Sequence, residues 1–179
     1  MMISRLPRGH NRAMLPVMNA NRRPVAVVVG ATSKWQADGR NTKLAHGKAL
    51  DDRDLPVGVR WGVGGAVAQK FAHEGFVTVL TTRKAANAAG LEKAIQEQGG
   101  TSFIVELDLV SPESIAKAFA TIRERAGDPD VLVYNAGYLE GRDLPPDKEL
   151  LEHVPLEILE TAQHIAIRGP FLVAKEVLP

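Results

Sequence analysis

Glycines at two places in this sequence could form a loop that binds a phosphate group. Gly30 ends the apolar run VAVVVG (25–30), and Gly62-Val63-Gly64 opens the stretch GVGGAVAQKFAHEG (62–75). Glycine suits such a loop because a Cβ atom would hold a phosphate away from the backbone. A helix that begins at the second pair of glycines would add free N–H groups and partial positive charge, which favour a pyrophosphate. The pattern therefore indicates a nucleotide site, although glycines that serve only a tight turn would read the same way.

Two further polar positions follow apolar runs later in the chain. Asp108 comes near the end of SFIVELDL (102–109), and Asn135-Ala136-Gly137 ends DVLVYNAG (130–137). Each position stands at the expected end of a strand. Both are also ordinary turn residues, because Asn and Asp tolerate turn geometry.

The residues after the second apolar run, FVTVLTT (76–82), bear on the choice of cofactor. An NAD site of this kind usually has a carboxylate about 20 residues after the glycines, where it binds the ribose 2′-hydroxyl. Here Arg83 and Lys84 occupy that place, and no acid lies between Gly75 and Gly90. A guanidinium carries a permanent charge and a planar fork of donors that match a phosphate. We therefore predict NADP(H) over NAD(H), with Arg83 on the 2′-phosphate; the alternative is a solvated basic start of a helix.

Other kinds of catalytic site find little support. There is no G-x-S-x-G motif, so the sequence gives no case for a serine hydrolase. The histidines are scattered without the spacing of metal ligands, and no metal site is predicted. Asp51, Asp52 and Asp54 form an acidic cluster, but Arg53 and Arg60 accompany it, which is typical of a solvated loop.

Composition predicts a single globular domain. The chain has 179 residues, of which 45% are hydrophobic, and a net charge of +1, which gives no case for nucleic-acid or membrane binding. No apolar run approaches the roughly 20 residues that a membrane helix needs. The absence of cysteine fits a reducing compartment, and we expect a cytoplasmic protein.

Residues 1–23 differ from the rest because they carry several arginines and no acid. We expect a basic flexible tail before a domain that covers 24–179. Two alternatives remain: a transit peptide, which Pro7 and Pro16 disfavour, and a start site assigned too early, with Met14 and Met18 as later candidates.

Alternating apolar patterns predict the elements that would position these residues. Short β-branched runs predict strands, and apolar residues at helical spacing predict helices. The clearest helix is 111–128, where Ser111 would be the N-cap and Pro112 the first helical residue. The expected strands are 25–30, 76–82, 102–109 and 130–137, and the expected helices are 64–75, 84–100, 111–128 and 150–178, the last bent near Gly169-Pro170. This alternation predicts an α/β fold with a doubly wound parallel sheet.

The set of motifs, taken in order, resembles the short-chain dehydrogenase/reductase family over residues 24–179. The matching features are the glycine pattern, the aspartate after the third strand, and N-A-G after the fourth. The resemblance implies a Rossmann-type sheet and assigns Asp108 and Leu109 to the adenine, and Asn135, Ala136 and Gly137 to the adenosine ribose. It assigns to the pyrophosphate the residues of the glycine-rich loop, namely Gly30, Thr32, Gly62, Val63 and Gly64.

The catalytic residues that the family would require are not found. In that family a tyrosine donates the proton, a lysine four residues later lowers the pKa of the tyrosine, and a serine orients the carbonyl group. Here Tyr138 follows Tyr134 at that spacing and Arg142 follows Tyr138, so neither tyrosine fits. Ala166 stands where the family often has a functional asparagine. We therefore assign no catalytic residue and expect an incomplete domain, with its C-terminal part absent and its last strand open at one edge.

Residues 33–60 form an insert between the first and second glycines of the loop. Its basic residues suggest a lid over the cofactor, with a surface loop outside the site and a gene-model artefact as alternatives. Loop closure becomes only slowly more costly with length, so such an insert is tolerable.

Two functions follow from the resemblance. The first is hydride transfer between NADP(H) and a carbonyl, alcohol or activated alkene, by a full-length form that could be a homo-oligomer. The second is a non-catalytic NADP-binding module or redox-sensing pseudoenzyme, because a fold does not fix a function.

Overall fold

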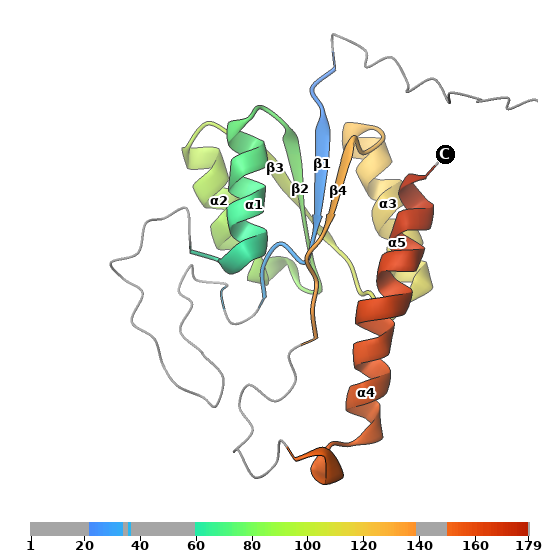
Figure 1. The fold of residues 1–179 in the computed structure, drawn as a ribbon. Coiled ribbons are helices and arrows are strands. Elements are labelled where there is room, and N and C mark those ends of the chain that lie inside the picture. Colours follow the sequence, from blue (N-terminus) through green and yellow to red (C-terminus); the bar gives the residue numbers. More distant parts are fainter. Residues whose placement is uncertain (1–21, 34–35, 37–59, 139–149, 179) are drawn as a thin grey trace, which may run out of the picture.

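The computed structural model describes residues 22–33, 36, 60–138 and 150–178. They form one parallel sheet with helices on both faces (Figure 1). The strands are β1 (Val25–Val29), β2 (Val77–Thr82), β3 (Thr101–Glu106) and β4 (Val131–Tyr134). The α-helices are α1 (Gly62–His73), α2 (Ala89–Glu97), α3 (Pro112–Ala126), α4 (Leu156–Gln163) and α5 (Gly169–Val177). Short turns are the 3₁₀-helices η3 (Ala85–Asn87) and η5 (Leu151–His153) and the π-helix η6 (His164–Arg168).

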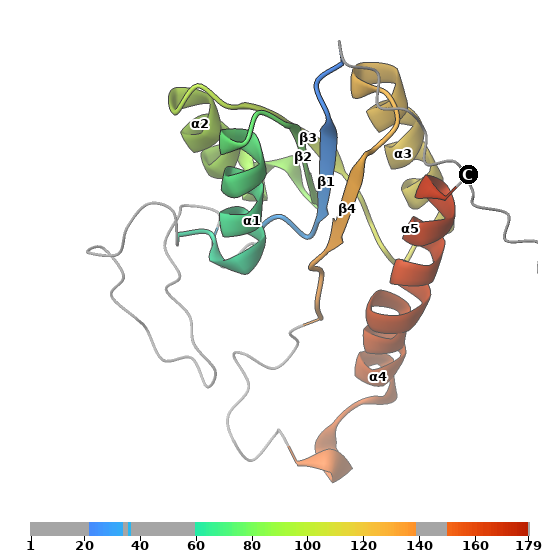
Figure 2. The same ribbon diagram turned by 45° about the horizontal axis from the view of Figure 1, so that its top comes forward.

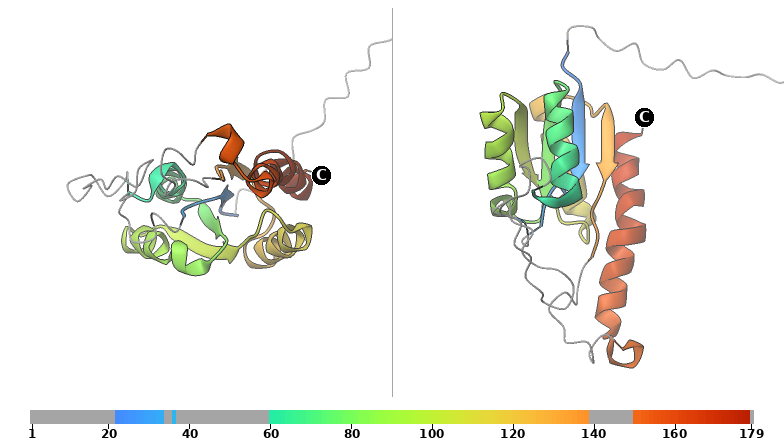
Figure 3. Two further views of the ribbon diagram at one scale, coloured as in Figure 1. Left: turned by 90° about the horizontal axis from the view of Figure 1, so that it is seen from below. Right: turned by 60° about the vertical axis from the view of Figure 1, so that its left-hand side comes forward.

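The strand order is β3-β2-β1-β4, with every neighbouring pair parallel. Helices α1 and α2 cover one face, and α3 and α5 cover the other (Figures 1 and 3). The chain proceeds from β1 outward to β3 and then crosses back to place β4 on the other side of β1. This confirms the predicted doubly wound sheet, and it puts a topological switch point between β1 and β4, where ligands of such sheets bind.

Strand β1 is the centre of the core. All five of its residues are buried, as the unbroken apolar run requires for a strand that is covered on both faces. Alternate residues serve different faces: Val27 belongs to the cluster that includes Phe119 of α3, whereas Val28 belongs to the cluster that includes Leu91 of α2. Helix α3 begins as predicted, because the Ser111 hydroxyl accepts a hydrogen bond from the Ser114 N–H at 3.1 Å.

The segment predicted as one helix, 84–100, is shorter and interrupted. The chain makes the turn η3, and α2 begins only at Ala89. The reason is a long-range contact. The Ala85 N–H donates to the Glu106 carboxylate at 2.8 Å, and the pairing of β2 with β3 brings these two residues together. Similarly, β3 and β4 end three residues earlier than predicted, because Leu107 and Asn135 each donate one last N–H to the neighbouring strand and the chain then leaves the sheet.

The last predicted helix, 150–178, divides into η5, α4, η6 and α5. The bend expected near Gly169-Pro170 takes the form of the π-helix that precedes these residues. The Gly169 N–H donates to the His164 carbonyl, five residues back, and Pro170 has no N–H to donate. Helix α4 extends past the carboxyl edge of the sheet (Figure 2), and its Leu156 and Leu159 are more than half exposed.

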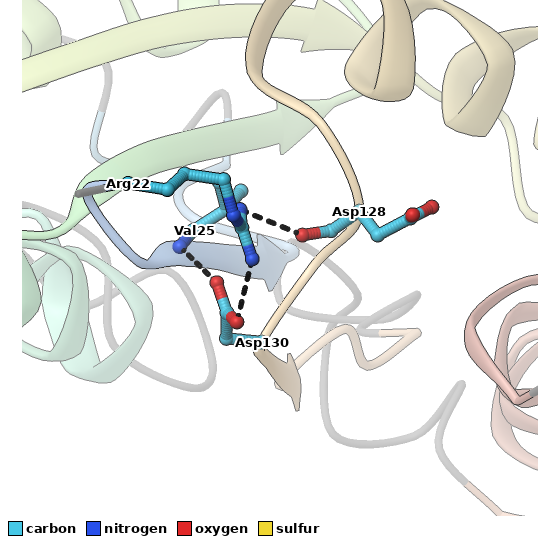
Figure 4. A network of polar contacts seen from close by, with 4 residues as sticks. All are labelled: Arg22, Val25, Asp128 and Asp130. Atoms are coloured by element: carbon cyan, nitrogen blue, oxygen red, sulfur yellow. Dashed lines mark hydrogen bonds and ion pairs between the residues drawn. The ribbon is translucent and has the colours of Figure 1, made fainter. Parts of the chain in front are cut away.

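A carboxylate holds the opposite, amino-terminal edge of the sheet together. One oxygen of Asp130 accepts the Val25 N–H at 2.7 Å, and the other pairs with Arg22 at 2.7 Å (Figure 4). Arg22 also donates to the backbone carbonyl of Asp128 at 3.2 Å. These contacts tie the entry of β1 to the entry of β4, so that both strands start in register.

We predict that Asp130→Ala lowers the free energy of unfolding by about 1–3 kcal/mol, because the part-buried Val25 N–H loses its acceptor. Urea denaturation followed by circular dichroism measures this change. Asp128→Ala is the matched control: its side chain is 86% exposed and its backbone carbonyl is retained, so we expect a change within about 0.5 kcal/mol. Equal effects of the two substitutions would show that the carboxylate of Asp130 does not hold the strands.

Candidate functional site

The ends of β1 and β4 are hydrogen-bonded to each other at the carboxyl edge of the sheet. The Asn135 N–H donates to the Val29 carbonyl at 2.8 Å, and the Asn135 side-chain amide donates to the Gly30 carbonyl at 3.0 Å. Gly30 has a φ of +78°, and a Cβ built on it would lie 2.7 Å from the Ala136 Cα. Gly30 is therefore required for the N-A-G turn to pack against the end of β1.

Gly64 brings the start of α1 onto the same point. A Cβ built on Gly64 would lie 2.4 Å from the Gly30 carbonyl oxygen, 2.7 Å from that of Ala31 and 2.7 Å from the Asn135 amide nitrogen. No side chain fits in this space. Gly30 and Gly64 are far apart in the sequence, yet their backbones are in contact, so the split glycine-rich loop is closed in space.

The loop between β1 and α1 also places polar side chains near the start of α1. Thr32 is 7% exposed, and its hydroxyl has no such partner, although its backbone carbonyl accepts from the Thr82 hydroxyl at 3.4 Å. Gly62 has a φ of +70°, and a Cβ there would lie 2.4 Å from the side-chain nitrogen of Gln36. Sequence reasoning missed Gln36, because nothing in the sequence around it predicts this approach.

Helix α1 leaves its first backbone N–H groups available to an anion. Its N-cap residue, Trp61, makes no side-chain capping bond, and the first turn contains no acid. The N–H groups of a first helical turn have no partner within the helix and carry the positive end of its dipole. The geometry therefore fits a phosphate group: close backbone approach, no Cβ, and donors directed out of the end of a helix.

Comparison with known proteins identifies this arrangement. A family model described as enoyl-(acyl carrier protein) reductase matches residues 58–179. Serine 3-dehydrogenase of Rhizobium radiobacter is 33% identical over 125 residues, which cover 70% of this chain and 47% of that protein. The chain belongs to the short-chain dehydrogenase/reductase family.

Solved structures show the same fold. A short-chain dehydrogenase/reductase from Burkholderia xenovorans superposes with a TM-score of 0.65 at 22% identity, covering 88% of this chain and 49% of that one. A variant of actinorhodin polyketide ketoreductase, solved with NADPH, superposes with a TM-score of 0.61 at 26% identity, covering 87% of this chain and 46% of that one. The chain thus spans about half the length of the short-chain dehydrogenases that it matches.

The residues expected at the adenine of a short-chain dehydrogenase lie on the turn after β3. The carboxylate of exposed Asp108 accepts the Val110 N–H at 3.1 Å, and the Asp108 N–H donates to the Ser114 hydroxyl at 2.9 Å. Leu109 is 8% exposed and packs in the core, so only its backbone faces the edge of the sheet. Asp108 is therefore a turn residue, as the sequence allowed, and its contact with adenine stays a prediction.

Arg83 lies where β2 ends, at the same edge of the sheet, and is exposed. Sequence reasoning found no acid near it, but the structure brings Glu106 from β3 into the same segment. The Glu106 carboxylate is occupied by the Ala85 N–H, which it accepts at 2.8 Å. It thus holds the turn that follows Arg83.

Tyr134 stands where short-chain dehydrogenases often have an asparagine. Its hydroxyl donates to the Ile165 carbonyl. That carbonyl needs this donor, because the π-turn draws the Gly169 N–H away to His164 and Pro170 offers none. Burial raises the pKa of Tyr134 to about 12. Its hydroxyl therefore joins β4 to the π-helix η6, directly before α5.

Several predictions from the sequence fall on residues outside this description. Five basic residues of the insert lie outside the described residues, namely Lys34, Arg40, Lys43, Lys48 and Arg53. The lid, surface-loop and artefact hypotheses therefore all remain predictions. Within residues 22–33, 36, 60–138 and 150–178, no group of three acidic or histidine side chains could hold a metal ion. Over the same residues, no helix has the length and apolar character to cross a bilayer.

We predict that Gly64→Ala lowers the free energy of unfolding by about 1–3 kcal/mol, because its methyl group meets two carbonyl oxygens and an amide at the closed loop. Chemical denaturation measures the loss. Gly137→Ala, in the N-A-G turn, is the control, since a Cβ there meets nothing within 4 Å and should change stability by less than about 0.5 kcal/mol. If Gly64→Ala proved as stable as Gly137→Ala, the close approach of α1 to β1 would be wrong.

Proposed function

We propose that this chain is the cofactor-binding part of a short-chain dehydrogenase/reductase and that it holds NADP(H). The observation that carries the proposal is the contact of Gly64 with Gly30 and Asn135 at the switch point of the sheet. Because Gly64 has no Cβ, α1 can begin against the end of β1, and its first N–H groups are then presented at the switch point, where a pyrophosphate would bind. The absence of an acid in the first turn of α1 adds to this fit.

Each part of the cofactor has a proposed place on this chain. The N–H groups of Gly62, Val63 and Gly64 and the buried Thr32 hydroxyl would hold the pyrophosphate, with Gly30 giving room for it. Asp108 and the backbone of Leu109 would bind the adenine. Asn135, Ala136 and Gly137 would border the adenosine ribose, because their turn lies against the end of β1.

When bound, the nicotinamide of the cofactor would supply or accept a hydride. We propose that the full protein transfers this hydride to or from a carbonyl, an alcohol or an activated alkene. Tyr134 does not serve as the proton donor, because its hydroxyl is bound to the Ile165 carbonyl and burial raises its pKa to about 12. The serine, tyrosine and lysine of the reaction would come from sequence other than these 179 residues.

A non-catalytic NADP-binding module, such as a redox-sensing pseudoenzyme, is the second candidate. The observation that favours it is Ala166, which stands in the π-helix where relatives often have a functional asparagine. The coding sequence after codon 179 separates the two functions. An in-frame serine followed by Tyr-x-x-x-Lys supports the enzyme, whereas a stop codon supports the module.

Arg83 supports NADP(H) as the cofactor. It is exposed at the carboxyl end of β2, the position from which a side chain reaches the 2′ substituent of the ribose. Glu106, at the end of β3, has one carboxylate oxygen engaged by the Ala85 N–H. The ketoreductase that shares this fold was itself solved with NADPH.

We predict that Arg83→Ala weakens NADPH binding by about tenfold to hundredfold, because a charge-assisted contact with the 2′-phosphate is lost. NADH has no 2′-phosphate, so its affinity should change little. Fluorescence titration of the chain with each dinucleotide gives the ratio of the two dissociation constants.

Lys93→Ala is the matched control, because Lys93 is an exposed cation on α2 whose described ion-pair partner is Glu97, on the same helix. It removes the same unit of charge and should leave the NADPH/NADH ratio unchanged. Equal weakening of NADPH and NADH by Arg83→Ala would contradict the assignment of Arg83 to the 2′-phosphate.

A further inference from the structure

Trp61 has an unusual backbone for its residue type. Its φ is +62°, the only positive φ among the non-glycine residues that the structure describes. The left-handed region crowds a Cβ against the following carbonyl, so a large side chain adopts it only when its surroundings hold it there. Trp61 is immediately before Gly62, at the point where the chain enters α1.

The indole ring is what holds Trp61 in this conformation. The residue is 7% exposed and belongs to the hydrophobic cluster that includes Ala88 and Leu91. A Cβ built on Gly65 would lie 2.5 Å from the Trp61 Cβ and 3.7 Å from the Leu91 Cδ1. Gly65 therefore leaves the space in which the start of α1, the tryptophan and α2 meet.

The ring is held by packing and not by a polar contact. The indole Nε1 is buried and has no hydrogen-bond partner within the described residues. A buried donor without a partner is unfavourable, so the apolar contacts of the ring with the α2 side of the cluster outweigh it. Ala88, a member of this cluster, ends the turn η3 and is the N-cap of α2, so the cluster anchors the end of the short segment that begins with Arg83.

We propose that Trp61 is a specificity-positioning residue: it packs the glycine-rich loop against the start of α2 and so fixes Arg83 at the 2′ position of the cofactor. The inference rests on the proposed NADP(H) site and deepens it. The pyrophosphate is bound by the backbone at 62–64, and the 2′-phosphate by the segment after β2. Trp61 is the side chain that links these two parts, since it borders Gly62 in sequence and Leu91 in space.

The test is the ratio of NADPH to NADH affinity in Trp61→Phe, Trp61→Ala and Leu91→Ala, each with Arg83 intact and with Arg83→Ala. Trp61→Phe keeps an aromatic ring and should keep the ratio. Trp61→Ala and Leu91→Ala should each lower the NADPH preference by about threefold to tenfold, and only while Arg83 is present.

Ile95→Ala is the matched control for Leu91→Ala, because Ile95 is as buried on α2 and belongs to the same cluster, but it lies against Gly100 and not at Gly65, where Leu91 and Trp61 come together. It should destabilise the fold without changing the ratio. Circular dichroism confirms that each variant is folded, and Leu91→Ala keeps the test decisive if Trp61→Ala does not fold.

The possible failures are distinct. If Arg83→Ala leaves the ratio unchanged, the proposed NADP(H) site itself is wrong. If Arg83→Ala shifts the ratio but Trp61→Ala and Leu91→Ala weaken both dinucleotides equally, or act alike with and without Arg83, the positioning role of Trp61 is overturned and the cofactor site stands.

Discussion

The contact of the Gly64 backbone with the carbonyls of Gly30 and Ala31 is the constraint on which the site depends. A Cβ at Gly64 would lie less than 3 Å from three polar atoms, so the position admits no side chain. The absence of a side chain lets α1 start at the end of β1 and point its free N–H groups at the switch point of the sheet. The same contact brings together the two glycines that lie on either side of the insert in the sequence.

The two edges of the sheet carry different contacts. At the amino-terminal edge, Asp130 and Arg22 join β1 to β4 through charged side chains. At the carboxyl edge, the Asn135 amide joins β4 to β1, the Thr82 hydroxyl donates to the Thr32 carbonyl, and the Glu106 carboxylate accepts the Ala85 N–H. The carboxyl edge also carries the buried Thr32 hydroxyl, which has no partner among the described residues, and the exposed Arg83. The chain belongs to the short-chain dehydrogenase/reductase family, and a solved structure about twice as long shares this sheet.

Sequence patterns predicted the helices and strands, but not the long-range contacts that decide where they begin and end. The buried run of β1 and the Ser111 cap of α3 were predictable, because burial on both faces and capping leave local signals. The break before α2 was not, since it depends on Glu106 of a different strand. The glycines of the site were found because backbone approach selects one residue type. Trp61 was missed because its burial brings it into one cluster with Leu91 of α2, which no local pattern connects to it.

The most direct test of the account is a backbone amide NMR titration of the isotopically labelled 19.3 kDa chain with NADPH. The account predicts that the largest chemical-shift changes come from the split loop taken together, at 30–32 and 62–65. Smaller changes should follow at 83–84, 108–109 and 135–137, and none at the amino-terminal edge around Asp130. Shifts confined to one half of the loop, or centred on the amino-terminal edge, would contradict a single phosphate site built from Gly30 and Gly64.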